Sequence, residues 1–518
     1  MSKSRILLAG AALFITLICW SLSSPINSHQ DEKFHFASIL CANGIESICT
    51  NVGTSKTGVE IVLLTVNLCT PKDTDDTKYK RILVARAPDK CRFEDSPNEL
   101  LENMSTNPNF FFETDKQIAT WIKFSDYPDF YFKALKNFDT ESAEKSVVVF
   151  RIFNSAVFVL LFVLFLLVSD QNLRTSFLFG LFATLIPHGI FLTAGMNNTS
   201  WAYTGCCFSW GFLYQFLSRP IQLQWRTIGA LFGWIFASLI VITSRYDTTL
   251  ILFLTNLMVL ISKVVINNRR TKTSMLIIFL SQAILFIFVY FEVPRFRQLL
   301  PRDLTQSITL FELLILLGNA IKLFIATPLR LFGLQPPGWG PLEPLKIVLW
   351  ANILLFVPVI FFAFRQRNRN LQIFQSFALC AFFGIYLTQV FARPDWTTPF
   401  YWIRTSWAYD QFSPRYFLPI FPFLLGILVL NSKKFLEISS SRNFLSALIT
   451  ILGFTHASTL VEIGATFREK PDWYWQDFPV GIRTLSTIGI ASFVSFLILV
   501  ISPLVAKEKS LQHDSDNS

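Results

Sequence analysis

The chain has 518 residues, of which 52% are hydrophobic and 15% aromatic, and its formal net charge is +10 at pH 7. Its mean hydropathy of +0.45 is higher than a soluble domain sustains, because too many apolar side chains would face water. The composition therefore excludes a soluble globular protein and predicts a multi-pass membrane protein, for which we expect no nucleic-acid partner.

Apolar segments with almost no charge recur along the chain. Each is about 20 residues long, which is enough to cross a hydrocarbon core of roughly 30 Å as a helix. They predict an all-α polytopic membrane protein with about twelve transmembrane helices. The predicted helices lie near residues 6–24, 148–168, 176–195, 201–218, 226–244, 248–266, 275–291, 345–364, 373–391, 416–431, 443–463 and 484–504.

The orientation of these helices follows from Lys and Arg, which are enriched in cytoplasmic loops. One more apolar run lies at 308–333. The basic groups can all face inward only if this run does not cross the membrane. We therefore interpret it as a re-entrant or interfacial element on the outer side, and the Pro- and Gly-rich stretch 336–344 favours this interpretation. The groups that then face the cytoplasm, with both termini, are Lys3, Arg5, Arg219, Arg226, Lys263, Arg269, Arg270, Lys272, Arg365, Arg367, Arg369, Lys433, Lys434, Lys507 and Lys509.

The first apolar segment is open to two interpretations. Lys3 and Arg5 precede it and Ser21-Leu22-Ser23 offers small residues, as in a cleaved secretory signal. Its apolar core is longer than the usual ~7 to 15 residues, which favours a retained helix. The predicted organisation is a first transmembrane helix at 1–24, an extracytoplasmic loop or small cap domain at 25–147, helices two to seven at 148–291, the outer re-entrant or interfacial segment at 292–344, helices eight to twelve at 345–504 and a cytoplasmic tail at 505–518.

The loop at 25–147 contains Cys41, Cys49, Cys69 and Cys91, an even number on the side of the membrane where disulfides persist. We expect one or two disulfides, and the sequence leaves all three pairings open. The spacings are not the short CxxC pairs of a structural zinc site. Two β-branched runs, at 61–66 and 81–85, predict short strands in this loop.

Polar residues within or beside the predicted helices are unusual, because an ionisable group in hydrocarbon costs about 2.5 to 3.5 kcal/mol and usually faces a cavity. They predict a polar cavity that opens outward. Arginines on the outer side, Arg415 among them, could bind phosphate with their guanidinium forks or could instead reach lipid headgroups or pair with acidic residues. The polar residues at outer helix ends or in outer helix halves are His188, Asn197, Arg245, Asp247, His456 and Glu462.

Two adjacent carboxylates, Asp31 and Glu32, follow the first helix, and His35 comes soon after. They are either solvated loop residues or part of a catalytic site. Further motifs are Tyr127-Pro128-Asp129-Phe130-Tyr131 before the second helix and Arg151 within it, Phe332-Gly333-Leu334 before the Pro-rich stretch, and Arg415-Tyr416-Phe417-Leu418-Pro419 at a late helix. Together they resemble an uncharacterised bacterial family of multi-pass membrane proteins that is similar to the GT-C glycosyltransferases. The chain departs from that family's pattern at 195–200, where only Asn197 matches.

The resemblance implies a GT-C-like fold and a reaction on the outer face, where GT-C enzymes take a sugar from a polyprenyl-phosphate donor. It implies that Asp31 is the catalytic carboxylate and Glu32 its partner. Such a carboxylate accepts the proton of an attacking hydroxyl or holds a divalent cation, and both roles stay open. With the polar residues above, it assigns substrate contacts to His35, Tyr127, Arg151, His188, Asn197, Arg245, Asp247, Arg415, Tyr416 and His456.

The predicted function is therefore a glycosyltransferase of the bacterial plasma membrane. Its predicted partners are membrane lipid, a lipid-linked sugar donor and an envelope glycan or glycoprotein acceptor. A transporter or flippase of lipid-linked sugars is the alternative, and it would need polar residues in both membrane halves and often repeated halves. No repeat is visible in the sequence, which favours the enzyme. A non-catalytic protein of envelope assembly is a third possibility.

Overall fold

The computed structural model describes the helical bundle and parts of the segment 25–147. The described segments are 1–24, 49–54, 60–64, 118–121, 129–139, 143–218, 224–266, 353–357, 371–376, 378–380, 418–430, 432–467 and 481–516, with the single or paired positions 35, 39, 314, 317–318, 321, 350, 361 and 383–384.

Helices make up the membrane part, as they must where no water can satisfy backbone N–H and C=O groups. Several of them are apolar along their whole length. In chain order they are α1 (Lys3–Ser23), α6 (Ala143–Val168), α7 (Gln171–Thr184), α8 (Pro187–Thr193), α9 (Asn198–Ser218), α10 (Trp225–Ile242), α11 (Tyr246–Ile266), the 3₁₀ turn η4 (Leu418–Ile420), α18 (Phe421–Val429), α19 (Lys433–Ser440), α20 (Arg442–Phe467) and α21 (Ile482–Asp516).

Within the described residues, 5 helices are long and apolar enough to cross a membrane, or 6 if the bent pair α7 and α8 counts as one span. The prediction of a multi-pass membrane protein is supported. The number twelve and a GT-C-like fold are not established by these residues. The predicted helix at 275–291 lies outside them, and those at 345–364 and 373–391 are only partly described.

Two predicted spans differ from the structure. The predicted helix at 176–195 is two helices, which meet at an angle of 92°. Pro187 lacks a backbone N–H and begins α8. A Cβ atom at Gly189 would lie 1.8 Å from the carbonyl oxygen of Thr184, so only glycine fits the bend. The predicted helix at 416–431 is only η4 followed by the 9 residues of α18.

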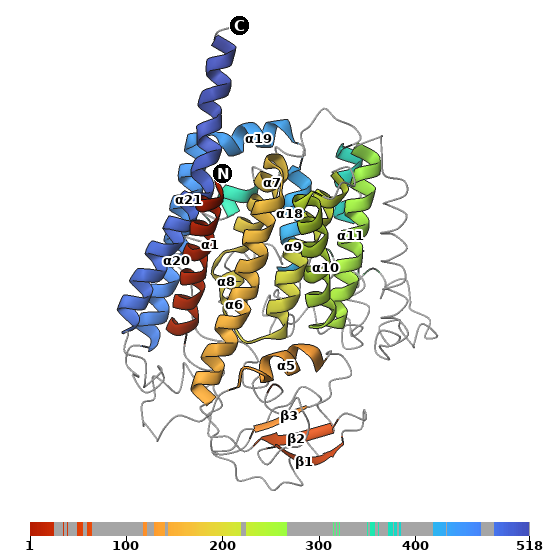
Figure 1. Ribbon diagram of the computed structural model, residues 1–518, viewed down its shortest axis with the longest axis vertical. Coiled ribbons are helices and arrows are strands. Elements are labelled where there is room, and N and C mark those ends of the chain that lie inside the picture. The colour runs from red at the N-terminus through yellow and green to blue at the C-terminus, as the bar shows by residue number, and fades with distance from the viewer. Residues whose placement is uncertain are drawn as a thin grey trace.

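Helices α1 and α21 pack against each other in antiparallel directions. Arg5 near the start of α1 donates to the carbonyl of Leu499 near the end of the α21 span at 2.7 Å. Small residues allow close approach: a Cβ at Gly10 of α1 would meet Val163 of α6, and one at Gly489 of α21 would meet Cys19. α1 therefore lies between α6 and α21 (Figure 1). α9 contacts α10, α11, α18 and α6, and it is buried along almost its whole length.

The two ends of the bundle differ. Figure 1 shows the N-terminus at one end of the bundle and the C-terminus projecting beyond that same end, here named the termini end; a β-sheet lies beyond the other end, named the sheet end. The sheet has 3 strands in the order β1 (Cys49–Thr54), β2 (Glu60–Leu64) and β3 (Ile118–Trp121), and both pairs are antiparallel. Strand β2 covers most of the predicted run at 61–66, whereas the run at 81–85 lies outside the described residues.

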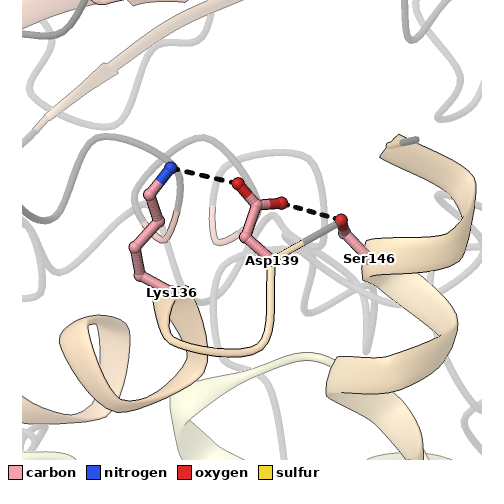
Figure 2. Close-up of polar contacts among 3 residues, drawn as sticks. All are labelled: Lys136, Asp139 and Ser146. Carbon is pink, nitrogen blue, oxygen red and sulfur yellow. Dashed lines mark hydrogen bonds and ion pairs between the residues drawn. The ribbon is translucent and has the colours of Figure 1, made fainter. Parts of the chain in front are cut away.

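Helix α5 (Asp129–Lys136) lies across the sheet end, between the sheet and the bundle (Figure 1). Asp139 joins it to α6. The carboxylate of Asp139 accepts from Lys136 Nζ at 3.1 Å and from Ser146 Oγ at 2.7 Å, and Figure 2 shows all three side chains meeting. These contacts fix the turn through which the chain passes from α5 into α6.

Candidate functional site

A cluster of buried polar side chains lies in the half of the bundle nearest the sheet, where α1 ends, α7 breaks, and α9 and α11 begin. Polar groups inside a membrane protein are costly unless they are hydrogen-bonded. Each of these side chains forms a hydrogen bond or lies at a helix end. The sheet-end polar cluster consists of Ser21, Ser24, Arg151, Asn154, Asn197, Thr199, Arg245 and His456, all buried.

Arg151 caps the C-terminal end of α1. Its Nη1 donates to the carbonyl oxygens of Ser21 at 2.6 Å and of Ser24 at 2.7 Å. The last carbonyls of a helix have no partner within the helix, and a cation there also interacts favourably with the helix dipole. Arg151 therefore holds the backbone at the point where the chain leaves α1 toward Asp31 and Glu32. Its predicted contact with substrate stays a prediction.

Asn154, one turn further along α6, joins several elements. Its Nδ2 donates to the carbonyl of Gly195 at 2.9 Å and to the hydroxyl of Tyr131 at 3.3 Å, and its Oδ1 accepts from Trp201 Nε1 at 2.8 Å. It thus connects α5, α6, the loop before α9 and α9 itself. Asn154 is not among the residues predicted from the sequence. A signal was present, because Arg151, Asn154 and Ser155 have the spacing of one face of an otherwise apolar helix.

The start of α9 is tied to the turn between α10 and α11. Asn197 precedes α9, and its Oδ1 accepts from the backbone N–H of Thr199 at 2.8 Å, as an N-cap does. Arg245 Nη1 donates to Thr199 Oγ1 at 2.8 Å, and Asn198 Nδ2 donates to the carbonyl of Ser244 at 3.3 Å. The structure therefore brings together Asn197 and Arg245, which the sequence predicted separately.

The break between α7 and α8 leaves irregular backbone inside the bundle. Side chains from other helices bond to it: His456 Nε2 to the carbonyl of Leu185 at 2.8 Å, and Ser21 Oγ to that of Ala194 at 3.0 Å. Irregular backbone is tolerated at membrane depth where protein groups satisfy it. All residues from 176 to 200 are described, and His188 alone among them is not buried. Helix α8 therefore presents His188 as the accessible polar group of this stretch.

The structure places His35 beside α5. It is buried, and its ring stacks on Phe132 with the centroids 5.9 Å apart.

Several other predicted site residues are not placed by the structure. Asp247 lies in α11 and Cys49 in β1, without described side chains, so the disulfides stay predictions. The predicted residues outside the described part of the chain are Asp31, Glu32, Cys41, Cys69, Cys91, Tyr127, Arg415 and Tyr416.

A metal site depends on the same undescribed carboxylates. Among the residues that the structure describes, no group of 3 or more His, Cys, Asp or Glu side chains could hold a metal ion. A divalent cation would need oxygen ligands of the kind that Asp31 and Glu32 offer.

Comparison with known proteins identifies one family. A family model described as "Predicted membrane protein (DUF2142)" matches residues 14–424, which is most of the chain and includes the sheet-end polar cluster up to Arg245. No curated protein matches the chain. No solved structure matches it either.

Proposed function

The chain belongs to this family of membrane proteins, and from that premise we propose that it is a glycosyltransferase of the bacterial plasma membrane. It moves a sugar from a polyprenyl-phosphate donor to a cell-envelope acceptor on the outer face of the membrane. The outer face, in this proposal, is the side of the sheet end.

The observation that carries the proposal is the sheet-end polar cluster, built around the exit of α1. Two of its members, Arg151 and Arg245, are buried guanidinium groups. Asp31 follows Ser24 by seven residues, and a chain extends by at most ~3.6 Å per residue, so connectivity keeps Asp31 within about 25 Å of Ser24. The carboxylates are therefore tethered to the end of the bundle where the sheet-end polar cluster lies.

In the proposed reaction, Asp31 accepts the proton of the acceptor hydroxyl as its oxygen attacks the anomeric carbon of the donor sugar. The bond between that carbon and the phosphate oxygen breaks, and polyprenyl phosphate leaves with the electron pair. Arg415 and Tyr416 bind the phosphate, since a guanidinium donates to two phosphate oxygens at once. Glu32 supports Asp31, either directly or as a second oxygen ligand of a divalent cation.

The proposal is tested with the full chain reconstituted in liposomes that contain a polyprenyl-phosphate sugar with a radiolabelled sugar. Added envelope glycan is the acceptor. We expect the label to move from the lipid fraction into the glycan and unlabelled polyprenyl phosphate to accumulate. If the labelled lipid stays intact and instead crosses the bilayer, the protein is a flippase and not a transferase.

A flippase is the second candidate because of two features. The first is the discontinuous helix pair α7 and α8, since broken helices line the substrate site of many transporters. The second is a buried polar group at the termini end, where Lys263 Nζ bonds to Ser218 Oγ and lies 3.4 Å from the ring centroid of Tyr214. Nearby, Gln215 Nε2 donates to the Asp170 carboxylate at 2.9 Å. Polar groups at both ends are what alternating access requires.

A further inference from the structure

His456 is a fully buried imidazole in the middle of α20. Trp20 of α1 lies edge-on to its ring with the centroids 5.6 Å apart, and Phe493 of α21 lies at 3.7 Å. Figure 1 shows α1, α20 and α21 side by side, so the ring is enclosed by helices on several sides. A polar ring in such apolar surroundings requires a specific partner.

The partner of His456 is the backbone at the helix break. Its Nε2 lies 2.8 Å from the carbonyl oxygen of Leu185, the residue that ends α7. A carbonyl oxygen only accepts, so Nε2 carries the proton in this bond. Within the described part of the chain, Nδ1 has no hydrogen-bond partner. The neutral ring with its proton on Nε2 therefore suits this position.

The bend of 92° carries α8 away from the axis of α7, so the Leu185 carbonyl needs a partner outside its own helix. His456 supplies that partner from α20, and Thr184 Oγ1 bonds to the Tyr203 hydroxyl at 3.0 Å on the same turn. Ser21 and Asn154 bond to the carbonyls of Ala194 and Gly195, just after α8. Helix α8 is thus held before its start and after its end.

We infer that His456 is a positioning residue, which acts as an Nε2–H donor to fix the break and to hold α8, with its half-buried His188, rigidly in place. The inference deepens the proposed function, because a transferase needs such a contact group preorganised, whereas a flippase needs the broken helix to move. The inference itself concerns the rigidity of α8, which is measured without any transfer assay.

The test compares two amide side chains of different length as replacements for the imidazole of His456. Glutamine places its amide nitrogen at about the reach of Nε2, whereas asparagine reaches about as far as Nδ1. We compare His456→Gln, His456→Asn and His456→Leu in the full chain, in lipid nanodiscs, by hydrogen exchange of the peptide that covers residues 186–197. The matched control is Thr459→Val, because Thr459 is also buried in α20 but bonds only to its own helix, at the carbonyl of Thr455.

We expect exchange across 186–197 to increase roughly 5- to 100-fold in His456→Leu and His456→Asn, because the unpaired carbonyl favours local opening. In His456→Gln and Thr459→Val it should stay within about twofold of the wild type, and α1 should exchange as before in every variant. Unchanged exchange in His456→Leu would overturn the inference. So would protection in His456→Asn but not in His456→Gln, because Nδ1 would then be the working atom.

Transfer is measured in the same variants as a separate readout. If the proposed function holds, kcat should fall with the loss of protection and recover in His456→Gln. If the wild type transfers no sugar, the proposed function fails, while the exchange pattern still decides the role of His456.

Discussion

Arg151, Asn154 and His456 all bond to main-chain carbonyls, at Ser21 and Ser24, Gly195, and Leu185. Each carbonyl lies where a helix ends or the backbone is irregular. An unpaired carbonyl buried from water costs roughly 1 to 3 kcal/mol, so these side chains stabilise the ends of α1 and α7 and the backbone after α8. These polar residues thus hold the backbone segments around the candidate site in position.

Arg151→Leu should lower the free energy of unfolding by roughly 2 to 5 kcal/mol, because it leaves two buried carbonyls without their donor. The measurement is denaturant unfolding of the purified protein in detergent micelles. Ser155→Ala is the control, since Ser155 lies on the same helix and bonds only within it, to the carbonyl of Arg151. Equal stability of the two variants would show that Arg151 does not hold the end of α1.

The sequence predicts most of the polar residues of the candidate site, but it does not predict which groups they bond to. Arg151, Asn197, Arg245 and His456 stand out in the sequence because charge and amides are rare in apolar segments. Their hydrogen-bond partners are mostly backbone groups from segments distant in the sequence. Which backbone groups these are depends on the folded structure and cannot be predicted from residue type. Asn154 was not predicted because one uncharged amide within a long apolar segment does not prevent that segment from spanning the membrane, so it gives no clear sign of a functional site.

At the scale of elements, helices α1, α6, α10, α20 and α21 lie close to their predicted positions because length and hydropathy determine a membrane span. The break between α7 and α8 was not predicted, since the run 176–195 is apolar enough overall to be taken as one span. Pro187 and Gly189 were the available signals. Their effect depends on the contact of Gly189 with Thr184 and on donors from remote helices, which hydropathy does not encode.

Gly189→Ala should destabilise the protein by roughly 1 to 3 kcal/mol or more, because the new methyl group would collide with the carbonyl of Thr184 and the backbone must move. Gly453→Ala is a matched control in α20: its Cβ would lie 3.4 Å from Val494, an ordinary contact, and alanine is the better helix former. Thermal unfolding followed by size-exclusion chromatography compares them. A Gly189→Ala protein as stable as Gly453→Ala would contradict the described bend.

For the whole molecule, the position of both termini at one end and of the sheet at the other agrees with the charge-based topology (Figure 1). At the termini end, Trp225 lies beside cations, with Lys3 at 5.9 Å and Arg226 at 5.5 Å from its ring centroid. Such an aromatic residue is typical of a membrane–water interface. Assignment of the termini end to the cytoplasm remains a prediction from the basic loops.

Reporter fusions test that assignment. A reporter fused near Gly338 should behave as periplasmic and one near Arg367 as cytoplasmic, because the basic group at 365–369 should face inward. Alkaline phosphatase and green fluorescent protein are the paired reporters, since each is active on one side only. A cytoplasmic signal at Gly338 would mean that the run at 308–333 crosses the membrane.

The central claim is that the carboxylate after α1 performs glycosyl transfer, and the most direct measurement is transfer from a radiolabelled polyprenyl-phosphate sugar by Asp31→Asn. The matched control is Asp139→Asn, a carboxylate at the same end that bonds Lys136 and Ser146. We expect Asp31→Asn to lose at least ~100-fold in rate at an unchanged protein level, because a general base contributes about that much, and Asp139→Asn to stay within about threefold of the wild type. Full transfer by Asp31→Asn would contradict the account.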